Sequence, residues 1–85
     1  MIESDMEGEL IVRSRLKELV TKREVEEGRR IAQKEICEAT GLNPNTVSRW
    51  MSPIPFDRFE SKPVVALCDW LGVSIGDLLI IERRN

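Results

Sequence analysis

The segment at residues 33–50, QKEICEATGLNPNTVSRW, constrains the fold most, because its apolar residues fit two short helices that meet at a glycine. Ile36 belongs to the apolar side of the first helix and Trp50 to that of the second. Gly41 stands at the turn between them. Cys37 falls where the two helices would cross, and only a small side chain there lets the backbones approach. The segment therefore predicts a tightly packed pair of helices.

The second helix of this pair has a well-marked start. Asn43 supplies a side-chain cap, and Pro44 suits the first helical position, whose N–H has no partner within the helix. Two helices joined in this way form a helix-turn-helix, and the second helix of such a motif can enter the major groove of DNA. We therefore expect a protein with this segment to read DNA.

Length and composition indicate one small globular domain. The chain has 85 residues, of which 41% are hydrophobic and 33% are charged. The apolar runs, such as residues 78–81, are far too short to span a bilayer, so we expect no membrane association. No stretch near the first residue combines a basic start with an apolar segment. The expected location is the cytoplasm.

Two cysteines and no histidine make a poor set of metal ligands. Cys37 and Cys68 both fall among apolar residues in helical patterns, so we interpret them as small core residues. A disulfide between them would need an oxidising compartment, which nothing in the sequence indicates. We also find no phosphate-cradling glycine loop and no nucleophile beside a base. The chain is therefore predicted to have no cofactor, no enzymatic activity and no small-molecule substrate.

The charge distribution is uneven. The net charge is −2, but four of the 15 acidic residues lie within residues 1–9. The rest of the chain has 13 basic and 11 acidic residues, a net charge of +2. No acidic residue lies within residues 39–56. We predict an acidic flexible arm at residues 1–9, a domain at residues 10–85, and weak non-specific binding to nucleic acid.

The first helix is predicted at residues 10–23. Val12, Leu16 and Leu19 follow the spacing of one helix face there. The end of this helix has two interpretations. It stops near residue 23 before a charged loop, or it continues to Glu27 with Gly28 as its stop.

Four further helices complete the prediction. Prolines at residues 52–55 end the third helix, and Phe56 and Phe59 are expected to be buried under the loop that follows. Ser74 and Asp77 resemble a capping box at the start of the last helix. No strand pattern is evident, so the predicted fold class is all-α with five helices. The four further helices are expected at residues 31–40, 44–51, 61–71 and 75–81.

Three segments in this order and spacing resemble the lambda-repressor-like helix-turn-helix family, the Cro and phage-repressor type also called the xenobiotic-response-element family. They are RLKELV at residues 15–20, QKEICEATGLNPNTVSRW at 33–50 and VVALCDWLGVSIGDLL at 64–79. The resemblance implies a five-helix DNA-binding domain that acts as a transcriptional repressor or autoregulator. Pro44 departs from the family, because many relatives have a polar base-reading side chain there.

The resemblance places the exposed start and outer face of the recognition helix at residues 43–49, with the helix itself at residues 44–51. Asparagine can pair with adenine, serine can bond to any base, and arginine can bind guanine or a phosphate. Pro44 either touches a thymine methyl or only starts the helix. If Arg49 does not contact DNA, it is a solvated side chain on an exposed face. The candidates for base contact are Pro44, Asn45, Ser48 and Arg49.

Other polar residues are candidates for phosphate contact. The resemblance gives Gln33 this role at the start of the second helix, and it places Arg58 and Lys62 where relatives often touch phosphate. Arg29 and Arg30 lie near the same helix start, but they also fit a self-paired surface with the acidic residues at 24–27. The full set of phosphate candidates is Gln33, Asn43, Thr46, Arg29, Arg30, Arg58 and Lys62.

The apolar run at residues 78–81 exceeds what one helix face can bury. Some of it is expected in the core, and the rest is expected to form a homodimer contact that would match a short palindromic operator on double-stranded DNA. The candidate dimer surface is Trp70, Leu78, Leu79, Ile80 and Ile81. The acidic charge and the apolar C-terminal run also fit a second hypothesis, in which the fold is a protein-interaction module that binds a protein partner.

Overall fold

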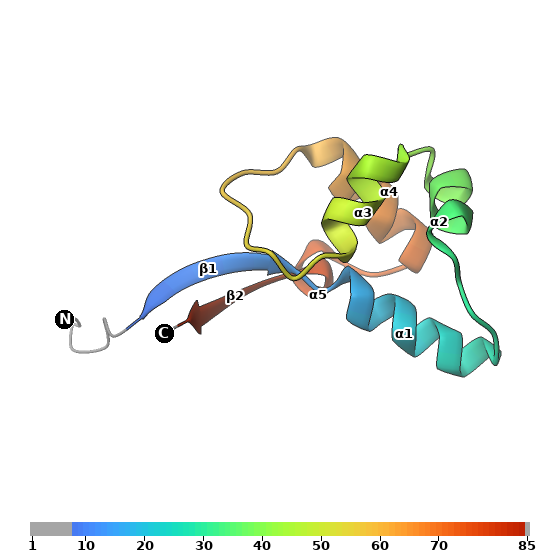
Figure 1. Cartoon of the computed structure of the whole chain (residues 1–85), viewed down its shortest axis with the longest axis horizontal. Coiled ribbons are helices and arrows are strands. Elements are labelled where there is room, and N and C mark those ends of the chain that lie inside the picture. Colours follow the sequence, from blue (N-terminus) through green and yellow to red (C-terminus); the bar gives the residue numbers. More distant parts are fainter. Residues whose placement is uncertain (1–7, 85) are drawn as a thin grey trace.

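The computed structural model of the chain describes residues 8–84. Figure 1 shows a body of helices from which two strands extend as a ribbon. None of the described helices is long and apolar enough to cross a membrane. Glu9, at the end of the predicted acidic arm, opens the first strand, and residues 1–7 of that arm lie outside the described residues. The elements in chain order are β1 (Glu9–Ser14), α1 (Leu16–Glu27), α2 (Gln33–Thr40), α3 (Pro44–Met51), α4 (Ser61–Leu71), α5 (Ile75–Leu78) and β2 (Leu79–Arg84).

Every helix contributes to one apolar core. The side chains that are completely buried come from α1, α2, α3, α4 and α5, so no helix stands apart from the others. Burial of such side chains is the main favourable term in folding, at about 1.5–3 kcal/mol for each. The predicted helices at residues 44–51 and 61–71 are confirmed, and the helix predicted at residues 31–40 begins two residues later, at Gln33. The buried members of the core are Leu16, Val20, Ile31, Ile36, Leu42, Val47, Trp50, Val64, Leu67 and Leu78.

The predicted helix at residues 10–23 is wrong in its first half. Residues Glu9–Ser14 form strand β1, and the helix begins at Leu16. Ser14, only 4% exposed, accepts a hydrogen bond from the Leu16 N–H to its Oγ at 2.9 Å. This local bond satisfies one of the free amides at the helix start and marks the change from strand to helix.

The C-terminal end of α1 follows the longer of the two interpretations. The helix continues to Glu27, and Gly28 adopts the left-handed conformation with φ of 68°. Its N–H donates to the Glu24 carbonyl at 2.8 Å, which is a common way to close a helix.

The last predicted helix is also too long, because α5 ends at Leu78 and residues Leu79–Arg84 form strand β2. The strand pairs antiparallel with β1, from Glu9 opposite Arg84 to Ser14 opposite Leu79. β-Branched residues such as Ile80 favour strands, and the partner strand that decides the outcome lies at the other end of the chain. The all-α prediction is therefore corrected to a mostly helical fold with a two-stranded sheet.

The ribbon is attached to the body through the loop between α3 and α4. The Phe56 N–H donates to the Val12 carbonyl at 2.8 Å, and these two residues form an isolated β-bridge. On the ribbon itself, the Arg13 side chain forms an ion pair with Glu82 across the two strands. The loop that follows α3 is thus fixed to β1.

Candidate nucleic-acid interface

The helix-turn-helix has the geometry predicted from its sequence. Gly41 ends α2 with φ of 78°, and its N–H donates to the Cys37 carbonyl at 2.8 Å. Asn43 caps α3, because its Oδ1 accepts the Thr46 N–H at 2.8 Å, and Pro44 occupies the first turn of the helix. The turn between α2 and α3 is therefore set by local bonds as well as by the core.

One face of α3 is left to solvent. Val47 and Trp50 are buried in the core, at 0% and 3% exposure. Pro44, Asn45 and Ser48 are exposed. Asn45 and Ser48 lie three residues apart and therefore one above the other on the helix. The structure brings these three candidates for base contact to one accessible face.

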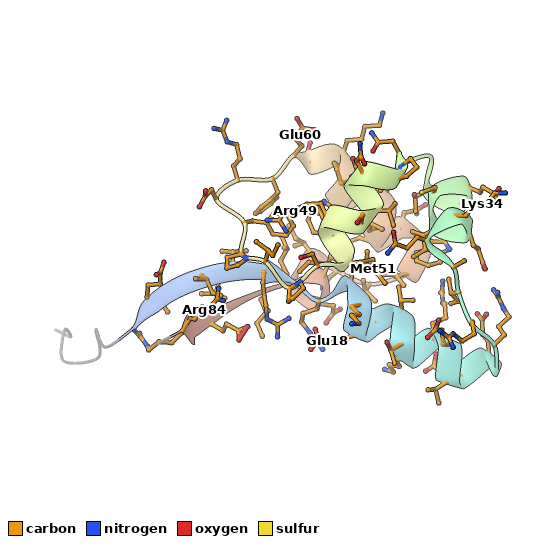
Figure 2. The ribbon with its side chains drawn as sticks, in the orientation of Figure 1. Glu18, Lys34, Arg49, Met51, Glu60 and Arg84 are labelled. Carbon is orange, nitrogen blue, oxygen red and sulfur yellow. The ribbon has the colours of Figure 1, made fainter. Side chains whose placement is uncertain are left out.

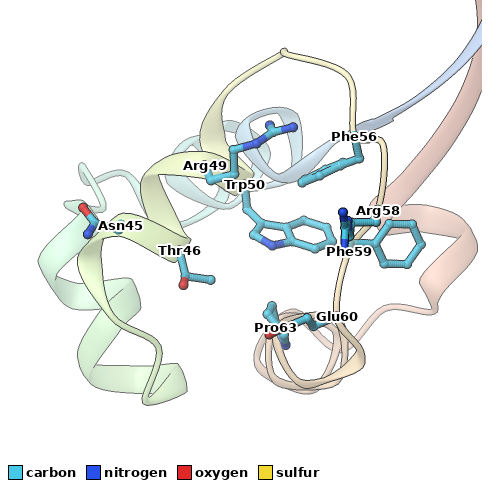
Figure 3. Close-up of a pocket in the computed structure, with 9 residues that line it drawn as sticks. All are labelled: Asn45, Thr46, Arg49, Trp50, Phe56, Arg58, Phe59, Glu60 and Pro63. Carbon is cyan, nitrogen blue, oxygen red and sulfur yellow. The ribbon is translucent and has the colours of Figure 1, made fainter.

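Arg49 departs from the expected arrangement, because it is half-buried and bound within the chain. Its guanidinium donates to the Ile54 carbonyl at 2.9 Å and to the Pro55 carbonyl at 2.7 Å. It also lies 4.0 Å from the centre of the Phe56 ring, a cation–π contact. Figure 3 shows the side chain reaching from α3 to the loop. Arg49 thus holds the α3–α4 loop against the recognition helix.

Three aromatic residues pack beneath this contact. The ring centres of Trp50 and Phe56 are 4.6 Å apart, and Phe59 lies 6.1 Å from Trp50. Phe56 is half-buried, whereas Phe59 remains 42% exposed, so the predicted burial of the two phenylalanines is only partly met. A hollow of about 300 Å³ opens beside the cluster (Figure 3). Its walls include Asn45, Thr46, Arg49, Arg58 and Glu60.

Most phosphate candidates lie on accessible positions around α2 and α3. Gln33 opens α2 and Asn43 precedes α3, and both side chains are exposed at helix N-termini. Thr46 is half-buried at the hollow. Exposed basic residues are Arg30, Arg58 and Lys62. Basic side chains are not confined to this face, since Lys34 lies on α2 and Arg84 on the ribbon at the opposite end (Figure 2).

Arg29 behaves differently from the other phosphate candidates. Its guanidinium donates to both Glu35 carboxylate oxygens, at 2.9 and 2.7 Å, and to Glu27 at 3.0 Å. These hydrogen bonds lower the pKa of Glu35 from its ordinary value of 4.5. For Arg29 the self-paired interpretation therefore fits better than a free phosphate-binding side chain.

The candidate dimer residues divide between core and surface. Leu78 is completely buried, so its assignment to a dimer surface is corrected to the core of the protomer. Trp70 is half-buried, and the Arg23 guanidinium lies 5.0 Å from its ring centre. Leu79 and Ile80 are half-buried, whereas Ile81 is 68% exposed.

The two cysteines are free thiols and are half-buried, so they are less enclosed than predicted. Both pack against the apolar core, and burial raises the pKa of the Cys68 thiol. Within residues 8–84 no group of three or more potential metal ligands comes together.

Sequence reasoning missed the groups that position Arg49. The two acceptors are backbone carbonyls, and no side-chain pattern reveals which carbonyl a loop will present. Phe56 was expected only as a loop anchor, yet it stacks on Arg49 and bridges to Val12. The Pro53–Ile54–Pro55–Phe56 order shortly after the helix was the available signal, because its two prolines restrict this loop.

A comparison with family models decides the classification. The model of the Cro/C1-type HTH DNA-binding domain matches residues 23–83. The chain belongs to this family. The match covers the helix-turn-helix, the α3–α4 loop, α4, α5 and most of β2, so the resemblance inferred from the sequence is confirmed. No curated protein and no solved structure matches the chain.

The role of Arg49 in this Cro/C1-type domain is tested by Arg49→Lys. Lysine keeps the charge but lacks the planar fork that binds two carbonyls at once. We expect the free energy of unfolding, measured by chemical denaturation, to fall by about 1–3 kcal/mol. Ser48→Ala, on the exposed face of the same helix, is the control and should change stability by less than about 0.5 kcal/mol. Equal stability of the two variants would contradict this role.

The Arg29–Glu35 pair predicts a dependence of stability on pH. Because the pKa of Glu35 is lower in the folded state, the pair stabilises the fold above the unfolded pKa and loses this effect as the pH falls through the lowered value. Glu35→Gln should therefore be less stable than the parent at neutral pH, with the two converging below pH 4.5. Glu38→Gln, exposed on the same helix, should show no such convergence. A parent–Glu35→Gln difference that persists in acid contradicts the prediction.

Proposed function

We propose that this Cro/C1-type domain is a sequence-specific transcriptional regulator that acts as a repressor or autoregulator. The main support is the exposed face of α3, which carries Pro44, Asn45 and Ser48 while the opposite face is locked into the core. The absence of acidic residues from 39–56 keeps like charge away from DNA at this helix. In this proposal α3 enters the major groove.

The base contacts are assigned by chemistry. Asn45 can bond to both the N6 amino group and N7 of adenine, which gives it the strongest specificity among the exposed residues. Ser48 lies one turn further along the helix and can bond to a base or a phosphate. Pro44 is left with apolar contact to a thymine methyl. Arg49 is proposed as a positioning residue, because its guanidinium already binds two loop carbonyls.

Phosphate contacts set the register on the DNA backbone. Gln33 and Asn43 can present polar side chains beside the helix N-termini, where free backbone N–H groups favour an anion. Arg58 lines the hollow beside α3 and supplies charge at the loop, and Lys62, exposed in the first turn of α4, supplies charge there. Thr46 and Arg30 complete this set.

A homodimer on a short palindrome is the proposed binding state. One α3 reads only a few base pairs, whereas a twofold dimer presents two recognition helices to half-sites about one DNA turn apart. Such a dimer would occupy a promoter and exclude competing proteins from it.

A second candidate function is a protein-interaction module that retains the family fold. It is favoured by an exposed apolar groove formed by Phe59, Val64, Val65, Cys68 and Ile75. Val65 and Ile75 are 65% and 53% exposed there. Partner binding that survives Asn45→Ala but fails on Val65→Glu, in this groove, would support this function.

The proposed DNA contacts are tested with a mixed-sequence duplex titrated over a range of salt concentrations. The parent should release no more than ~6 phosphate counterions, because few basic side chains flank α3. Arg58→Ala and Lys62→Ala should each lower the affinity and reduce the slope by about 1.

Lys22→Ala is the matched control for these substitutions, because Lys22 is an exposed basic residue on α1. It should bind the duplex as the parent does. A parent slope that requires more counterions, or equal losses in all three variants, would contradict the assignment of the phosphate contacts.

A further inference from the structure

The apolar groove of about 540 Å³ lies between α4 and α5, beside the α3–α4 loop. Three of its walls face solvent, since Val65 is 65% exposed, Ile75 53% and Phe59 42%. Contiguous apolar surface left in water commonly marks a place where another molecule binds. The residues that line the groove are Phe59, Ser61, Val64, Val65, Cys68 and Ile75.

The groove is formed before any partner arrives. Four of its residues come from one face of α4, at i, i+3, i+4 and i+7 counted from Ser61. Val64 is only 7% exposed and belongs to the apolar core, so the floor is fixed. The Phe59 ring centre lies 6.1 Å from that of Trp50, which supports this wall from behind. A partner therefore meets an ordered surface and pays little to organise it.

The rim of the groove is acidic. Residues 59–77 supply every lining residue and contain three acidic residues but only one basic residue, Lys62. Glu60 stands between two lining residues in the chain, and Asp69 lies one helical turn beyond Val65 on α4. Basic residues beside the apolar face of a partner would complement this rim.

The third acidic residue, Asp77, approaches the groove from the side of α5. Its carboxylate accepts a hydrogen bond from the Ser74 hydroxyl at 3.1 Å, directly before the lining residue Ile75. Burial and, second, the charge of Asp77 raise the pKa of the Cys68 thiol, so this carboxylate lies near the groove. Acidic groups thus belong to both helices that form the groove.

The chemistry of the walls favours a helix over an extended segment as the occupant. An extended segment brings backbone N–H and C=O groups that need hydrogen-bond partners. Among the six lining residues only Ser61 carries a hydroxyl, so the walls offer few partners. A helix satisfies its own backbone groups and can place apolar side chains at i, i+3, i+4 and i+7 into such a groove.

Charge disfavours a second copy of this chain as the occupant. A twofold contact would set the groove against itself. The acidic excess of residues 59–77 would then face the same excess on the other copy, and like charges across an interface repel. A different protein with basic residues at its binding face meets no such repulsion.

We propose that the apolar groove binds an amphipathic helix of another protein, with apolar side chains on one face and lysine or arginine residues beside it. The inference rests on the second candidate function, because it supplies a partner for the same groove. It does not depend on whether α3 reads DNA.

The probe is a synthetic helical peptide with leucine at i, i+3, i+4 and i+7 and lysine at its other positions. Its binding to the full chain is measured by fluorescence anisotropy. One matched peptide has glutamate in place of every lysine, and another has a central proline that breaks the helix. Only the first peptide should bind. Failure of the first peptide to bind, or equal binding of either matched peptide, would overturn the inference.

Two substitutions place the peptide in the groove. Val65→Ser and Ile75→Ser should each lower the affinity for the lysine peptide about tenfold, because each removes apolar surface that the leucines would cover. Asp69→Asn should lower it about two- to fivefold, with a smaller effect at high salt. Circular dichroism should show the helix content of the parent in Val65→Ser and Ile75→Ser, because both side chains are exposed.

Val25→Ser is the matched control, because Val25 is 78% exposed on α1 and does not line the groove. It should bind the lysine peptide as the parent does. Unchanged affinity in both Val65→Ser and Ile75→Ser, or an equal loss in Val25→Ser, would contradict binding at the groove.

Sedimentation separates this inference from self-association. The parent and Val65→Ser should have the same mass, judged against 9.8 kDa for one chain. Loss of a parent dimer in Val65→Ser would show that a second copy occupies the groove and would overturn the inference. Binding to a mixed-sequence duplex is measured in parallel, so a parent that binds the duplex but not the lysine peptide refutes this inference and leaves the DNA-binding proposal intact.

Discussion

The pairing of β1 with β2 is the constraint on which the rest of the arrangement depends, because it joins the two ends of the described chain. It brings Leu78 beside the start of α1, where the Arg15 N–H donates to its carbonyl at 2.7 Å. It also gives the loop after α3 a fixed point, since Phe56 bonds to Val12 on the outer side of β1. Arg49 then connects this loop to the recognition helix. The ribbon and α3 are therefore parts of one continuous set of contacts.

Through this connection the ribbon helps to position α3, the helix proposed to read DNA. The sequence predicted a DNA contact for Arg49, but in the structure this side chain is half-buried and bound to the Ile54 and Pro55 carbonyls. In the proposed function Asn45 and Ser48 then provide the base specificity, and the surrounding basic residues provide the charge that attracts DNA.

The sequence predicted those parts of the structure that local bonds decide. The Asn43 cap, Gly41 as a helix end, and the exposed face of α3 all follow from residue type and spacing, and Gly28 was one of the two ends that the sequence allowed for the first helix. It failed at both ends of the chain, because Val12 fits a helix face with Leu16 as well as it fits a strand. Only contact with β2, distant in sequence, decides between them. The hydrogen-bond partners of Arg49 could not be predicted from the sequence either, because they are backbone carbonyls.

The most direct test of the central claim, that α3 reads DNA bases, is selection from a pool of random duplexes at low salt with the parent and with Asn45→Ala. We predict that the parent enriches a short palindrome and that Asn45→Ala, folded equally well, loses the preference at the positions read by this side chain. Enrichment of no sequence by the folded parent, or of an identical sequence by both proteins, would contradict the account.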